Sequence, residues 1–162
     1  MYAVTKIITF CYGHRLLNYQ GKCRYLHGHN GTVEIELSSE RLDRRGMVRD
    51  FTEIKQAIQA WIERSLDHKM LLHRKDPVVP VLRSLGEPMF LMASNPTAEA
   101  IAQLIYDYTA SLGFPVTAVR MWETDRSVAA YSLDSPRRSG ARSGLRRVAA
   151  RRRAVRTTST AA

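Results

Sequence analysis

Three of the five histidines in this 162-residue chain, His14, His27 and His29, lie within sixteen residues of one another. Alternate residues of an extended chain project to the same side, so the His27 and His29 imidazoles can converge on one point. His14 ends another predicted strand, and antiparallel pairing would bring it beside that pair. Three neutral imidazoles leave one tetrahedral position of a zinc ion open, as in catalytic rather than structural sites. The alternative is three loop histidines that never meet, because a bare His-x-His motif is a weak signal.

The two cysteines differ in their surroundings. Cys23 precedes His27 by four residues and is flanked by Lys22 and Arg24, and nearby cations or a metal favour the thiolate. Cys23 is therefore a candidate catalytic base, with a packed core cysteine or a fourth metal ligand as the alternatives. Cys11, in an apolar strand, is expected to belong to the core. A cytoplasmic location is expected for a chain with neither a secretory signal pattern nor an apolar run of membrane-spanning length, and it argues against a disulfide.

Two further acidic positions could take part in chemistry. Asp67 and His68 end the first predicted helix, where an acid beside an imidazole can form a proton relay or simply cap the helix. Glu123 ends the third predicted strand. A buried carboxylate there would bind a guanidine-like edge through two hydrogen bonds, whereas an exposed one would be an ordinary surface residue.

The elements that must position these side chains follow from hydrophobic periodicity. Strands are predicted over residues 4–12, 30–38, 116–123 and 128–133. One helix is predicted to begin after Asp50 and another after Asn95, with Pro96 at its first position and Gly113 at its end. The order strand, strand, helix, helix, strand, strand predicts an α+β domain whose two helices cover one face of a four-stranded antiparallel sheet.

Two segments fit that order poorly. Residues 72–96 hold four of the six prolines, which disfavours long regular structure, and residues 89–92 are predicted as either a short edge strand or a packed loop. Residues 134–162 hold nine arginines and one aspartate, so they carry +8 of the net charge of +10. The domain, residues 1–134, is thus nearly neutral, and nucleic-acid binding is expected only through the basic tail, if at all. The tail, residues 135–162, is predicted to be disordered.

Six short motifs, in order over about residues 2–133, make the chain resemble the family of 6-pyruvoyl and 6-carboxytetrahydropterin synthases. The motifs are Phe10-x-x-x-His14, Cys23-x-x-x-His27-Gly28-His29, the run from Gly46 to Phe51, Leu66-Asp67-His68, Pro96-Thr97-x-Glu99 and Glu123-Thr124.

The resemblance implies a T-fold (ββααββ) and a homo-oligomer, usually a hexamer, with active sites between subunits. It implies zinc on the three clustered histidines, Cys23 as the catalytic base, and Asp67 and His68 as proton-transfer partners contributed by a neighbouring subunit. Glu123, helped by Thr97, would hold the pterin. The substrate would be 7,8-dihydroneopterin triphosphate.

The product depends on the branch of the family. The three-residue gap between Cys23 and His27 resembles the queuosine-pathway branch, which forms 6-carboxytetrahydropterin, acetaldehyde and triphosphate. The alternatives are the branch that forms 6-pyruvoyl tetrahydropterin and a non-catalytic pterin-binding module. A third branch, with a glutamate near the cysteine position, is disfavoured. The longer stretch from 72 to 95 and the Arg-rich tail depart from the family pattern.

Overall fold

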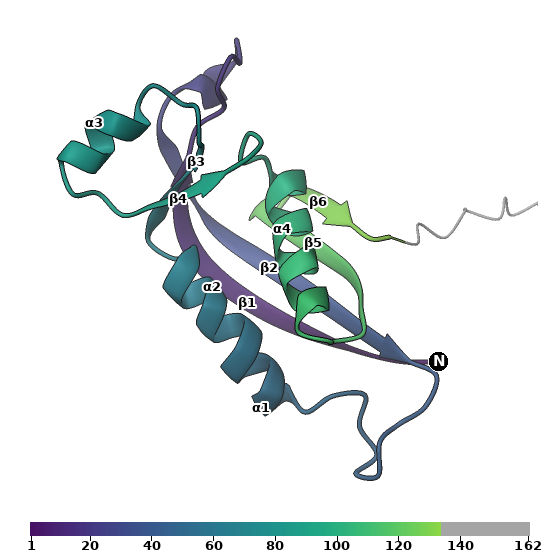
Figure 1. The fold of residues 1–162 in the computed structure, drawn as a ribbon. Coiled ribbons are helices and arrows are strands. Elements are labelled where there is room, and N and C mark those ends of the chain that lie inside the picture. The colour runs from purple at the N-terminus through teal and green to yellow at the C-terminus, as the bar shows by residue number, and fades with distance from the viewer. Residues whose placement is uncertain (134–162) are drawn as a thin grey trace, which may run out of the picture.

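The computed structural model describes residues 1–133 as an α+β domain (Figure 1), so the predicted disordered tail lies outside the described residues. One sheet has the strand order β4-β3-β1-β2-β5-β6. The strands are β1 (Tyr2–His14), β2 (His27–Ser39), β3 (Lys69–His73), β4 (Met89–Met92), β5 (Val116–Thr124) and β6 (Ser127–Tyr131). The helices are α1 (Phe51–Ile54), α2 (Ala60–Ser65), α3 (Val79–Ser84) and α4 (Ala98–Ser111), and a 3₁₀ turn covers Lys22–Arg24.

The long ribbon of β1 and β2 confirms the first two predicted strands. They pair antiparallel in an unbroken register from Tyr2 opposite Ser39 to His14 opposite His27. Alternation along β2 buries Val33 completely, together with every second residue up to position 37, against the helices. The register fixes His14 beside His27 at the end of the ribbon.

The two longer helical segments cover the same face of the sheet (Figure 1). Asp50 caps the first, as predicted, by accepting a hydrogen bond from the Thr52 N–H. A π-helical turn, Lys55–Gln59, joins α1 to α2. Ile54, Ile58 and Ile62 are fully buried at spacing i, i+4. Phe51, the first residue of α1, is 51% exposed at the end of this apolar face.

The start of α4 differs from the prediction. Thr97, not Asn95, is the N-cap, and its hydroxyl accepts a hydrogen bond from the Ala100 N–H. The side chain of Asn95 is occupied elsewhere, in two hydrogen bonds to the backbone of Leu17. Gly113 follows the helix with φ +78°, the left-handed conformation that favours glycine at this position.

The predicted four-stranded antiparallel sheet is wrong in strand number and in part of its pairing. β3 pairs with β1, and β4 with β3, both in parallel. Five-residue β3 escaped prediction because Leu71 and Leu72 are both buried, so it lacks polar–apolar alternation. β4 shows that residues 89–92 form the edge strand, and α3, with Pro80 near its start, occupies the proline-rich stretch.

Among residues 1–133 no helix combines the length and the apolar character needed to cross a membrane.

Candidate active site

The three predicted metal ligands converge at the end of the β1–β2 ribbon. One ring nitrogen from each of His14, His27 and His29 lies within 4.8 Å of the others, and His14 is buried. His14 and His27 face each other across the ladder, and His29 lies opposite Tyr12. Antiparallel pairing therefore produces the cluster that the spacing predicted.

Backbone carbonyls fix the tautomers of two of these histidines. The Nδ1 of His14 lies 2.7 Å from the Pro96 carbonyl oxygen, and the Nδ1 of His27 lies 2.8 Å from the Tyr25 carbonyl oxygen. A carbonyl only accepts, so each neutral ring must donate from Nδ1 and leave a lone pair on Nε2. Those two Nε2 atoms are 3.0 Å apart. Two lone pairs at that distance repel each other unless a cation lies between them.

This arrangement fits a tetrahedral metal ion. Ligand nitrogens about 2.0–2.1 Å from zinc are roughly 3.3 Å apart, close to the observed spacing. Metal-bound histidines commonly donate their second ring N–H to a carbonyl or carboxylate, as His14 and His27 do. Burial lowers the pKa of His14 below its ordinary value, despite the nearby Pro96 carbonyl and Glu123, and so favours the neutral ring that a metal requires. The three histidines therefore form a candidate metal centre with the donor set of a catalytic zinc site.

A cavity of about 260 Å³ adjoins His14 and brings together three other predicted site residues, Cys23, Thr97 and Glu123. Cys23 lies in the 3₁₀ turn between β1 and β2, and its carbonyl accepts the Leu16 N–H at 2.8 Å. The Thr97 hydroxyl oxygen accepts a hydrogen bond from the Ala100 N–H, and the hydroxyl can still donate its own proton to a ligand. The cavity thus combines a thiol, a hydroxyl and a carboxylate beside the candidate metal centre.

Glu123 is held in place by a residue that sequence reasoning missed. The Tyr12 hydroxyl lies 3.4 Å from Oε1 of Glu123 and donates to it, and the same oxygen is 3.9 Å from Nε2 of His14. Burial, reinforced by the facing Glu123 carboxylate, raises the pKa of Tyr12 far above its ordinary value, so the hydroxyl stays protonated. The carboxylate is 27% exposed and can still accept hydrogen bonds from a ligand.

Asp67 and His68 form a hydrogen-bonded pair beside Cys11. Nδ1 of His68 is 2.8 Å from Oδ2 of Asp67, and Oδ1 accepts the Cys11 N–H at 2.8 Å. Partial desolvation acts to raise the pKa of Asp67, but the hydrogen bonds from Cys11 and His68 outweigh it and lower that pKa below its ordinary value. The pair remains an ionised acid with an oriented imidazole.

Within one chain this pair does not share the cavity of Cys23. His68 lines a larger cavity of about 600 Å³ that also includes Cys11, His27 and His29. Cys11 itself is exposed, contrary to its predicted place in the core. The alternation that buries Phe10 and Tyr12 puts Cys11 on the opposite side of the strand.

The other residues that sequence reasoning missed act mainly through their backbones or through distant loops. The carbonyls of Tyr25 and Pro96 orient two histidines, and Asn95 holds the loop after β1. Backbone acceptors carry no residue-type signal, so spacing could not reveal them. The position of Tyr12 two residues before His14, on the same face of a strand, was the one usable signal.

Comparison with known proteins places these features in one class. Residues 3–134 match the family model described as 6-pyruvoyl tetrahydropterin synthase, and the chain belongs to this family. A solved but uncharacterised protein from Wolinella succinogenes is 27% identical, with a TM-score of 0.70 over 82% of this chain and 98% of that one. The 6-pyruvoyl tetrahydropterin synthase of Caenorhabditis elegans, 20% identical over 82% of this chain and 96% of its own, has the same fold with a TM-score of 0.62.

Curated relatives carry a more particular name. A protein from Rickettsia conorii named 6-carboxy-5,6,7,8-tetrahydropterin synthase is 35% identical over 131 residues, covering 76% of this chain and 95% of its own. A protein of the same name from Aquifex aeolicus is 35% identical over 123 residues, covering 68% of this chain and 75% of its own.

Proposed function

We propose that this protein is a zinc-dependent lyase that converts 7,8-dihydroneopterin triphosphate and water to 6-carboxy-5,6,7,8-tetrahydropterin, acetaldehyde and triphosphate. The relatives that bear the name of this synthase support the product branch. The observation that carries the proposal is the facing pair of Nε2 lone pairs on His14 and His27, beside the cavity that holds Cys23 and Glu123. The reaction would supply a queuosine precursor in the cytoplasm.

Some residues of the chain would bind the metal and the pterin, and others would transfer protons. Zinc held by His14, His27 and His29 would polarise and acidify the side-chain hydroxyls of the substrate. Glu123, anchored at one oxygen by Tyr12, accepts hydrogen bonds from the amino-pyrimidinone edge of the pterin, with help from the Thr97 hydroxyl.

Cys23 is the group proposed to remove the carbon-bound proton as triphosphate leaves. It lies in the same cavity as Glu123, so a pterin on the carboxylate would present its side chain towards the thiol and the metal. Lys22 and Arg24 flank the thiol in the sequence. Cys23 would then act on a carbon of the substrate side chain next to the hydroxyls that the metal would bind.

Asp67 and His68 are proposed to serve the active site of a neighbouring subunit. Within one chain neither of them lines the cavity of Cys23, which suits a site completed by assembly, with a homohexamer as the proposed state. The His68 side chain is 78% exposed and is oriented by Asp67, so it could reach a partner's site as a proton shuttle.

Product analysis of the purified full-length protein tests the proposal. With 7,8-dihydroneopterin triphosphate, mass spectrometry should find 6-carboxytetrahydropterin together with acetaldehyde. Formation of 6-pyruvoyl tetrahydropterin without acetaldehyde would assign the other branch, and tight pterin binding without any product would leave a binding module.

A substitution at Cys23 tests the assigned base. Cys23→Ala should retain metal and pterin binding but lose turnover, whereas Cys11→Ser, which changes the other cysteine, should keep it. A fully active Cys23→Ala protein would show that another group removes the proton.

A further inference from the structure

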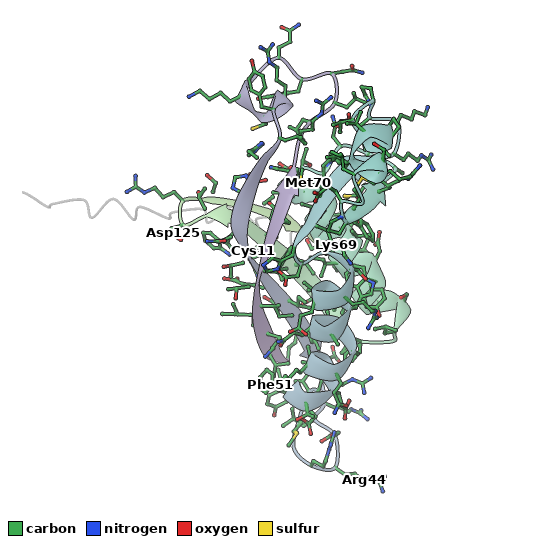
Figure 2. The ribbon with its side chains drawn as sticks, turned by 90° about the vertical axis from the view of Figure 1, so that its left-hand side faces the viewer. Cys11, Arg44, Phe51, Lys69, Met70 and Asp125 are labelled. Atoms are coloured by element: carbon green, nitrogen blue, oxygen red, sulfur yellow. The ribbon has the colours of Figure 1, made fainter. Side chains whose placement is uncertain are left out.

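A second cluster of metal-binding side chains lies on the other side of the sheet from His14. One ligand atom from each of Cys11, Asp67 and His68 falls within 4.8 Å of the other two. Cys11 is three residues before His14 on β1, so the two side chains point to opposite faces. Figure 2 shows Cys11 on β1 near Lys69, the first residue of β3. Asp67 and His68 directly precede Lys69 and so lie beside Cys11.

The backbone of Cys11 fixes the positions of the other two residues. Its N–H donates to Asp67, and its carbonyl accepts the His68 N–H at 2.7 Å. His68 has φ +54°, an uncommon conformation for a residue with a side chain, and this bond helps to hold it there. The three residues are therefore held together before any ligand binds.

The donors at this cluster suit a borderline-soft cation. A thiolate, an imidazole and a carboxylate are the three ligand types that zinc takes in proteins. A fourth donor is adjacent, because Oδ1 of Asn30 lies 3.1 Å from the Cys11 sulfur. Asn30 is the residue opposite Cys11 in the β1–β2 register, so it shares the same face.

We propose that Cys11, Asp67 and His68, with Asn30 beside them, form a second site for Zn²⁺ or a similar divalent ion. Ligand atoms of one tetrahedral zinc are roughly 3.3–3.7 Å apart, given bonds of about 2.0–2.3 Å, and those of the cluster lie within 4.8 Å of one another, so a small side-chain adjustment suffices. The exposed side chain of His68 can make that movement by rotating, while the backbone around Cys11 stays fixed.

Occupancy of this site has a consequence that rests on the proposed function. A metal bound to His68 and Asp67 takes the lone pairs that a proton relay needs. Excess zinc would then inhibit turnover through the second site, while the first site remains loaded.

Cobalt titration of the full-length Cys23→Ala protein tests the site itself, because Cys11 is then the only thiol. The protein should bind two equivalents of Co²⁺, one of them with a thiolate-to-cobalt charge-transfer band in the near ultraviolet. Cys11→Ser in the same background should lose that band and one equivalent. Loss of the band in a His68→Ala variant would place the imidazole in the same site.

Three outcomes would overturn the proposal: binding that ends at one equivalent without the band, a band that persists in Cys11→Ser, or a band unaffected by His68→Ala. Failure of the histidine site is distinguishable, since one equivalent with the band would then remain. In the enzyme assay, excess zinc should slow the wild type and leave Cys11→Ser at its starting rate, and equal inhibition of both would refute the inhibitory role.

Discussion

Asn95→Ala should destabilise the protein by loosening the loop that follows β1. The amide bridges the Leu17 backbone through Oδ1 to its N–H at 2.8 Å and through Nδ2 to its carbonyl at 2.9 Å. Each such bond contributes about 0.5–1.5 kcal/mol net, so the loss should be about 2 kcal/mol. The N–H and the carbonyl of Leu17 are both part-buried, so water can replace the lost partner only incompletely. This adds to the expected loss of stability.

Urea unfolding of the metal-free protein, at one fixed protein concentration, measures this loss of stability. With a slope of about 2 kcal/mol per molar urea, the midpoint should fall by about 1 M. Gln103→Ala, which removes an exposed amide on α4, is the matched control and should move the midpoint by less than about 0.3 M, since such surface changes cost within about 0.5 kcal/mol. If Asn95→Ala shifts the midpoint no more than this control does, the bridge to Leu17 does not stabilise the fold.

Two other changes follow from the same structure. Thr97→Ala removes the N-cap of α4 and should lower the free energy of unfolding by about 1 kcal/mol. Thr97→Ser keeps a capping hydroxyl and should retain the wild-type value in the same urea experiment. Burial lowers the pKa of His14 below about 6.5, so the unfolded chain takes up this proton first as the pH falls. The resulting stability is complete above pH about 6.5 and is lost as the pH falls towards the folded-state pKa. Unfolding of the metal-free protein across this range should show the decline, and His14→Gln should flatten it; an identical decline in both would contradict this assignment.

The sequence could predict what depends on periodicity and short spacing. Strand-forming composition indicated β1, alternation indicated β2, and β5 and β6 were also predicted; the geometry of an extended chain put His27 and His29 on one side. Helical spacing and the Asp50 cap located the first helix. These signals are local, so they survive without knowledge of the neighbours.

What the sequence could not predict depends on pairing between distant segments. β3 has no alternation of its own, and the sequence left residues 89–92 between an edge strand and a loop; both segments form strands because their backbones pair in parallel with β1 and with each other. Asn95 satisfies N-cap preferences, yet the loop at Leu17 competes for its amide and leaves Thr97 as the cap. The exposed position of Cys11 follows from alternation with Phe10 and was misjudged because the surrounding strand is apolar.

Metal analysis of one variant tests the central claim, a catalytic ion on the three clustered histidines. Wild-type protein and His27→Ala, both loaded with zinc and dialysed in parallel, should differ by one equivalent per subunit, with the variant also inactive. His73→Ala, which changes a histidine of β3 outside the cluster, should match the wild type. Undiminished zinc in His27→Ala would contradict the account, because the facing nitrogens of His14 and His27 would then not share an ion.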